Sequence, residues 1–290
     1  LREGGVKIFQ IETTLNNDTF GTPALDTASP LSMLQKREWE WTAKDRAAFL
    51  AVQAGLKRMP ARAKRRAFQA WKAPYAVTSV QAGEVEAVHE RTLANLHRQQ
   101  LVEVQGQSDV LIMGVPYLGP YNVNSILNPI LVHCLGLGYL FNMYRNMPLV
   151  REGGVVIMTH PTYRDFHPVH HPSYIDFFDE VLADTTDPAV MSKKWEQKYA
   201  EDEWYRHLYR TGNAYHGVHP FYMWYWGQRG REKVSRVIVV GADNQTVPAL
   251  MGWETAGSLA EAVSMARGTM GRSAQITMLH HPPILMTDVV

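Results

Sequence analysis

The placement of the histidines is the first indication of a functional site in this sequence. Seven of the twelve histidines lie between His160 and His219, mostly within two short segments, residues 159–171 and 215–222. Imidazole titrates near neutral pH, so such side chains move protons or ligate metals. The spacing matches no zinc signature, because there is no HExxH motif and HxxHH alone is a weak signal. Taken singly, each histidine is better explained as a hydrogen-bonded structural residue, but the cluster as a whole predicts a polar, His-rich cleft.

A second candidate region, residues 114–125, combines turn-forming glycines and prolines with hydrogen-bonding side chains. The glycines and prolines force a rigid turn, and Tyr121, Asn124 and Ser125 follow it. We expect these three side chains at the N-terminus of a helix, where free N–H groups and the helix dipole favour an anion. Capping of that helix by an asparagine would need no ligand. The sequence leaves both explanations open.

Asn128, His160 and Arg164 add further polar groups to this region. Asn128 lies four residues after Asn124, so a helix would project both side chains from one face. His160 and Arg164 follow an apolar strand, and a parallel sheet would bring the end of that strand close to the helix start. Arg164 can bind a carboxylate through two parallel hydrogen bonds; pairing with Asp165 or with solvent is the alternative. The candidate substrate-binding residues are therefore Tyr121, Asn124, Ser125, Asn128, His160 and Arg164.

These side chains need a scaffold, and the pattern of apolar segments predicts one. Short, continuously apolar strands alternate with helices from residue 101 onward. This alternation is typical of an α/β fold with a mostly parallel sheet that is covered by helices on both faces. Ligands bind such sheets at the carboxyl edge, where the candidate segments begin. We expect strands at residues 6–15, 76–80, 101–105, 110–113, 154–159, 237–240 and, last, 276–279, and helices at residues 34–71 with a break at Pro60, 83–99, 123–144, several within 173–231, and 259–270.

The composition limits the classes of protein. The chain has 290 residues, of which 46% are hydrophobic and 20% charged, so it can bury a sizeable core and is not a disordered segment. Its net charge of +1 gives no global reason to expect nucleic acid or an anionic membrane as a partner. Residues 36–72, however, contain eleven lysines and arginines and only three acidic residues. This segment is either a solvated helical surface or a docking face for an anionic cofactor or nucleic acid.

The cysteine count and the apolar stretches bear on the compartment. A single cysteine, Cys134, excludes an internal disulfide framework and a cysteine-based zinc cage, so we expect a reducing cytoplasm. The longest apolar stretch, residues 126–141, is shorter than the roughly 20 residues that a membrane span needs. The chain begins at Leu1 without a methionine, and residues 2–5 look like a helix end with a glycine cap. We therefore expect an N-terminal portion to be missing from this sequence.

Five segments occur in an order and at a spacing that resemble a known family. They are residues 6–16, 81–89 (QAGEVEAVH), 109–116, 153–157 (GGVVI) and 237–241. Together they resemble the C-terminal half of the nickel-dependent lactate racemase family. The resemblance implies two α/β domains with an active site between them. Residues 1–100 would be the end of the N-terminal racemase-like domain with a basic helical insertion, and residues 101–290 would be the C-terminal α/β domain.

The resemblance also implies a cofactor and a reaction. In the family, a nickel-pincer nucleotide takes a hydride from the α-carbon of a 2-hydroxy acid and returns it to either face, while a histidine accepts the hydroxyl proton. The catalytic histidines, the cofactor-bearing lysine and the nickel-ligating histidine of the family lie in the N-terminal half. No catalytic residue and no metal ligand is therefore assigned here. We expect the nickel-pincer nucleotide in the full-length protein, and we expect the isolated chain to hold none and to be inactive.

One position departs from the family pattern. The lysine that meets the substrate carboxylate in the family corresponds to a position near Asn128. Asparagine can still hydrogen-bond a carboxylate, but it supplies no charge. This departure favours a different or larger hydroxy acid over lactate.

Two other functions remain open. A non-enzymatic α/β binding module would hold an anionic partner through the basic segment, residues 57–66, although that segment lacks the aromatic residues that single-strand nucleic-acid binding needs. A metal-dependent hydrolase would use the histidines from His160 to His219. In the leading interpretation the partner is a small 2-hydroxy acid, without nucleic acid or membrane, and the oligomeric state stays open.

Overall fold

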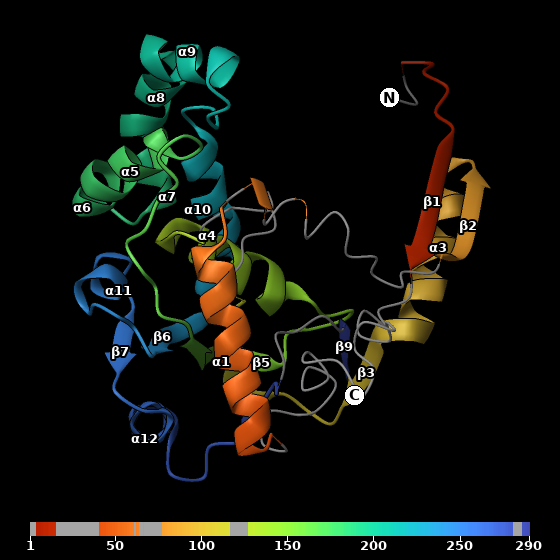
Figure 1. The fold of residues 1–290 in the computed structure, drawn as a ribbon. Coiled ribbons are helices and arrows are strands. Elements are labelled where there is room, and N and C mark those ends of the chain that lie inside the picture. Colours follow the sequence, from red (N-terminus) through yellow and green to blue (C-terminus); the bar gives the residue numbers. More distant parts are fainter. Residues whose placement is uncertain are drawn as a thin grey trace. The chain divides into compact units, whose positions relative to one another are not determined.

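The computed structural model describes residues 4–15, 41–60, 62–63, 66, 77–116, 127–280 and 286–290 (Figure 1). The chain divides into two compact units, Leu1–Gln100 and Leu101–Val290. The assignment of these units to racemase-like domains stays a prediction. Within the described ranges, no helix is both long enough and apolar enough to cross a membrane.

The first unit contains an antiparallel pair of strands with a helix against it. β1 (Gln10–Leu15) pairs with β2 (Val77–Gly83), and α3 (Val85–Gln100) packs against both strands (Figure 1). The strand that we expected from residue 6 begins only at Gln10, because its partner strand ends opposite it at Gly83. The helical region expected over residues 34–71 is described mainly as α1 (Ala43–Arg58).

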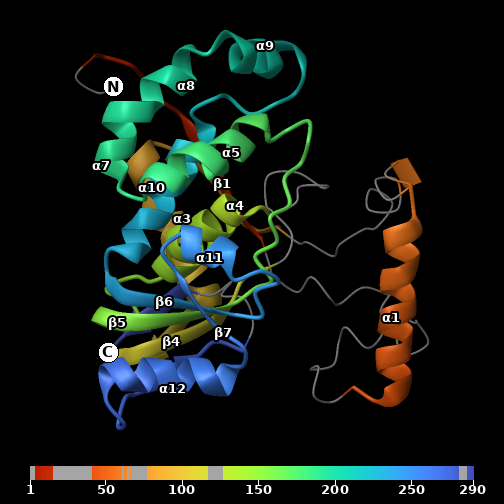
Figure 2. The same ribbon diagram turned by 90° about the vertical axis from the view of Figure 1, so that its left-hand side faces the viewer.

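The second unit is built on a five-stranded parallel sheet with the strand order β7-β6-β5-β4-β8. Helices cover both faces of this sheet, and Figure 2 shows α12 (Leu259–Met270) on one side with α10 (His219–Arg231) on the other. The predicted α/β fold class is therefore confirmed. The strands are β4 (Ser108–Gly114), β5 (Val150–Thr159), β6 (Val234–Val240), β7 (Glu254–Ala256) and β8 (Ile276–Met278).

The two faces of the sheet bury separate apolar clusters, because successive side chains of a strand point to opposite faces. Met158 and its equivalents on β4 and β6 pack in the larger cluster with the buried residues of α10. Ile157 and its equivalents pack with the alanines of α12 in the smaller one. Strands that are buried on both faces read as continuous apolar runs, which explains why the sequence revealed β5 and β6 so clearly.

The connection from β5 to β6 starts with a non-helical segment, residues 160–171, and continues mainly through helices. The helix after β4 is short and irregular. Pro129 takes the first helical position there, so the described helix starts six residues later than the one that we expected from residue 123. It continues through a π-helical stretch, η4 (Cys134–Tyr139), and a 3-10 turn, η5 (Leu140–Asn142). The remaining helical segments are α4 (Pro129–His133), α5 (Pro172–Asp176), η6 (Phe177–Val181), α6 (Leu182–Asp184), α7 (Pro188–Met191), η7 (Ser192–Glu196), α8 (Gln197–Glu201), α9 (Glu203–Thr211) and α11 (Thr246–Leu250).

β3 (Leu101–Val104) is observed where the sequence predicted a strand, but it lies outside the central sheet and pairs in parallel with β9 (Met286–Val289). Residues 276–279 are therefore not the last strand, because β9 follows them. β9 contains Asp288, a buried carboxylate that pairs with Arg145, so its sequence lacks a continuous apolar run.

Candidate active site

The carboxyl ends of β4 and β5 lie side by side. Gly114, the last residue of β4, is opposite Thr159, the last residue of β5. Both candidate segments therefore leave the sheet at the same edge, as expected. Three of the candidate residues, Tyr121, Asn124 and Ser125, lie outside the described residues, and their roles stay predictions.

His160 is the first residue after β5 and is buried. Its backbone N–H donates to the Val240 carbonyl of β6 at 3.2 Å, and its ring Nδ1 accepts the backbone N–H of Thr162 at 2.9 Å. The second bond places the proton of the neutral imidazole on Nε2. Burial lowers the pKa of His160 to about 4, so the ring is uncharged at neutral pH.

Thr162 carries backbone strain at this exit. It is fully buried and has a φ of 46°, which is costly for a β-branched residue. Its hydroxyl finds no hydrogen-bond partner among the described residues. Such a conformation persists only where the surroundings fix it, and it is typical of functional loops.

Asn128 and His171 form the best-defined polar pair of this region, and both side chains are fully buried. The sequence predicted Asn128 inside a helix, but Asn128 instead caps the start of α4. Its Oδ1 accepts the backbone N–H of Leu131 at 3.0 Å. The cap turns Nδ2 towards the ring Nδ1 of His171, which is 3.3 Å away. The backbone N–H of His167 also donates to this Nδ1, at 3.2 Å.

These two donors determine the protonation of His171. Because both meet Nδ1, the ring proton must reside on Nε2. Nε2 is buried and has no hydrogen-bond partner in the described part of the chain. Leaving such a donor unpaired costs about 1–3 kcal/mol, so Nε2 is a natural place for the oxygen of a ligand. Burial above all, and then the neighbouring histidines, lower the pKa of His171 to about 3.

Aromatic rings surround this imidazole. Tyr215 stacks on His171 with ring centroids 5.5 Å apart and on His219 with centroids 4.4 Å apart. The Tyr174 hydroxyl contacts Nδ1 of His219, whose pKa is lowered to about 4, mainly by burial. The starts of α5 and α10 bring these residues together, since α10 packs against both α4 and α5. We call Asn128, His171, Tyr174, Tyr215 and His219 the His171 cluster.

The histidines of this region interact with one another and with the backbone. His167 and His170 stack with centroids 4.2 Å apart, and Nδ1 of His170 contacts the carbonyl of Asn213 at 2.8 Å. Over the described ranges, no group of three or more His, Cys, Asp or Glu side chains is arranged to hold a metal ion. The chemistry that the His171 cluster offers is hydrogen bonding by neutral imidazoles.

Arg164 lies apart from this cluster. Its Nη2 contacts both carboxylate oxygens of Asp179, at 2.6 and 2.5 Å, and the arginine side chain is 49% exposed. No hydrogen bond or ion pair between described residues joins it to His160 or Asn128. Arg164 forms a local ion pair, which is the alternative to binding a carboxylate, but its partner is Asp179 and not Asp165. A role in binding a carboxylate stays a prediction.

Comparison with known proteins gives the following. No family model and no curated protein matches this chain. Among solved structures, it is similar to the lactate racemase apoprotein from Thermoanaerobacterium thermosaccharolyticum, with 15% identity and a TM-score of 0.45 over 73% of this chain and 43% of that one. A protein from Thermotoga maritima is 10% identical, with a TM-score of 0.40 over 75% of this chain and 46% of that one. The chain thus spans less than half the length of either solved structure.

Proposed function

We propose that this chain is the C-terminal part of a racemase or epimerase that acts on a 2-hydroxy acid. Two features support the proposal: the order of the sequence segments that resemble the lactate racemase family, and a parallel sheet with buried polar groups following its carboxyl edge. The observation that carries it furthest is the Nε2–H of His171, which is buried and lacks a partner among the described residues. A hydroxyl or carboxylate oxygen of a small acid would accept this hydrogen bond.

His171 acts in this proposal as a neutral hydrogen-bond donor. Its low pKa makes it a poor acceptor of the substrate hydroxyl proton at neutral pH. A fixed neutral imidazole stabilises negative charge that develops on an oxygen, without reorganisation during the reaction. Asn128 holds the ring and its tautomer, so it is a positioning residue.

The proposal includes the nickel-pincer nucleotide as the cofactor of the full-length protein. In the part of the chain that the structure describes, no group of three or more His, Cys, Asp or Glu side chains is arranged to hold a metal ion, and we assign no described residue to the cofactor. No step proposed for these residues passes through the cofactor. The resemblance implies that the residues holding it lie in an N-terminal half, together with the catalytic histidines.

The test uses the full-length protein, prepared with its cofactor, and follows interconversion of 2-hydroxy acid stereoisomers. Substrate deuterated at the α-carbon should react more slowly, and His171→Gln should lower kcat/KM by about 100-fold, as loss of one such donor typically does. His207→Gln, at an exposed position of α9, is the control and should leave the rate unchanged. Absence of interconversion, or full activity of His171→Gln, would contradict the proposal.

A further inference from the structure

One side of α10 carries two aromatic and two basic residues in a row, which we call the α10 stripe. Tyr222 and Trp226 are each 51% exposed, Arg229 is exposed, and Lys233, two residues after the helix, is half-buried. The backbone N–H of Lys233 still donates to the Gly230 carbonyl at 3.2 Å, so Lys233 remains in the last turn. The spacing of four, three and four residues places the whole stripe on one side of the helix.

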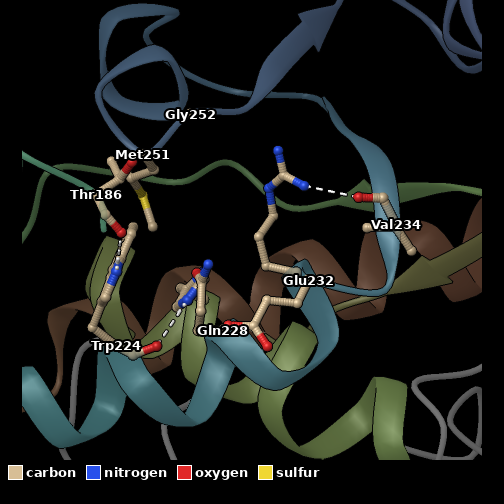
Figure 3. Close-up of a pocket in the computed structure, with 9 residues that line it drawn as sticks. Thr186, Trp224, Gln228, Glu232, Val234, Met251 and Gly252 are labelled. Carbon is tan, nitrogen blue, oxygen red and sulfur yellow. Dashed lines mark hydrogen bonds between the residues drawn. The ribbon is translucent and has the colours of Figure 1, made fainter. Parts of the chain in front are cut away.

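The opposite side of α10 faces the interior of the second unit. Trp224 is buried there, and Arg231 is held on that side by a hydrogen bond from its Nη1 to the Val234 carbonyl at 2.9 Å (Figure 3). The two cations of the stripe, Arg229 and Lys233, form no ion pair and no cation–π contact with another described residue. Their charges are therefore available to a partner.

The indole of Trp226 is fixed in place. It lies so close to Gly138 of η4 that an added Cβ there would collide with its Cδ1, and its ring centroid is 5.4 Å from that of Tyr139. Asn142 supports this contact, because its Nδ2 donates to the carbonyls of Leu137 and Gly138, both at 2.9 Å. A ring that is already fixed loses little conformational entropy when a partner covers its exposed part.

A hollow with a volume of about 640 Å³ borders the stripe. Trp226, Arg229 and Lys233 line it from α10, and Tyr144 and Glu152 are among the residues that complete its wall. A helix that packs on the stripe therefore has space for its side chains. The hollow shares no residue with the His171 cluster, so its occupant is separate from the proposed substrate.

The stripe is complementary to itself. Its spacing of four, three and four residues is the same in both directions, and reversing the order puts a cation where a ring was. An antiparallel second copy of α10 therefore brings Trp226 opposite the partner's Arg229, and Tyr222 opposite the partner's Lys233. Two-fold symmetry repeats each contact, so every member of the stripe meets a residue of the other kind. The spacing is also that of the a and d positions in a two-helix seam.

We propose that this chain forms a two-fold symmetric dimer through the α10 stripe, with a second copy of the chain as the occupant of this face. A cation above the face of an indole or phenol ring is attracted by it, and this attraction strengthens as water is excluded. Because one helix per chain is a small interface, we expect a dissociation constant in the micromolar range or weaker.

Sedimentation equilibrium of the 290-residue chain, at about 5 to 500 µM, tests this inference. We expect a monomer–dimer equilibrium. Trp226→Ala should raise the dissociation constant at least about tenfold, because the symmetric dimer loses two ring–cation pairs. Arg210→Glu, at an exposed position of α9, changes the net charge away from the stripe and should leave the constant unchanged. A chain that stays monomeric throughout, or a dimer that Trp226→Ala does not weaken, would overturn the proposal.

A matched pair of variants tests the antiparallel register. Trp226→Glu and Trp226→Lys both remove the indole, but the first places a carboxylate opposite the partner's Arg229 and the second places a like charge there. Trp226→Glu should therefore dimerise at least about tenfold more tightly than Trp226→Lys, and equal constants contradict this register.

Thermal unfolding checks that the Trp226 variants fold. If they do not, Arg229→Glu decides the matter, because this exposed position does not contribute to the core. It replaces the cation at the partner's Trp226 with an anion, so it should also raise the dissociation constant at least about tenfold. A dimer that is as tight in Arg229→Glu as in the parent chain would show that the stripe is not the interface.

Discussion

Nδ2 of Asn128 lies 3.3 Å from Nδ1 of His171, although the two residues are 43 positions apart in the chain. The same asparagine caps α4 through its Oδ1. One side chain therefore begins a helix with one atom and fixes the tautomer of a buried imidazole with the other. This arrangement couples helix stability to the orientation of the proposed hydrogen-bond donor.

The two roles of Asn128 can be separated by substitution. Asn128→Ala should lower the free energy of unfolding by about 1–3 kcal/mol, because it removes both the cap and a hydrogen bond to a buried ring. Asn128→Asp retains an oxygen for the cap but brings an acceptor and a negative charge to Nδ1 of His171. It should raise the pKa of His171, measured by NMR titration. An Asn128→Ala variant as stable as the parent in urea, or an unchanged titration in Asn128→Asp, would contradict the arrangement.

Four histidines with lowered pKa values predict how stability depends on pH. Burial lowers the pKa of His133 and of His171 to about 3, and that of His160 and of His219 to about 4, from an ordinary value of 6.5. Below about pH 6.5 the unfolded chain takes up protons that the folded chain does not, so stability is full above that pH and falls as pH decreases towards 4. Each group contributes a slope of about 1.4 kcal/mol per pH unit.

Urea unfolding between neutral pH and about pH 5 measures this slope. We expect it to approach the uptake of four protons, and His171→Gln should reduce it by about one proton. The exposed His207 provides the control, since His207→Gln should leave the slope as it is. A free energy of unfolding that stays constant over this range would show that these rings are not held neutral by the fold.

Some elements could be predicted because their signals are local. α12 was expected over residues 259–270 and is observed as Leu259–Met270. Its start is marked by Ser258, which accepts the N–H of Glu261, and Glu261 in turn accepts the N–H of Gly257. This reciprocal cap lies within five consecutive residues, Gly257 to Glu261. The signals for β5 and β6 are likewise local, because each is a continuous apolar run within the strand itself.

Other features depend on partners that are remote in sequence. β9 is held by β3 and by Arg145, which pairs with Asp288 more than a hundred residues away. The importance of His171 depends on Asn128, on Tyr215 and on its own burial, none of which the HxxHH spacing contains. The sequence therefore placed a His-rich segment after the carboxyl end of β5, but its spacing did not single out His171.

Arg164 offers a test that separates its structural and functional roles. Its ion pair with Asp179 is about half exposed on both sides, so Arg164→Ala should change the free energy of unfolding by less than about 1 kcal/mol. If Arg164 also binds the substrate carboxylate in the full-length enzyme, kcat/KM should fall substantially while folding stays intact. Unchanged kinetics would show that the carboxylate is bound elsewhere, and Asp179→Asn, which breaks only the ion pair, is the matched control.

Two helical glycines should respond to alanine in opposite directions. Gly227, buried in α10, lies against His133, and an added Cβ would be 2.7 Å from the His133 carbonyl oxygen. Since this backbone cannot recede without disturbing the stacked ring of Trp224, Gly227→Ala should cost about 3 kcal/mol or more. Gly268, in α12, has no atom within 4 Å of an added Cβ, so Gly268→Ala should stabilise the chain by about 0.5–1 kcal/mol. Urea unfolding of both variants measures the difference, and a mild effect at Gly227 would mean that α10 and His133 are not in close contact.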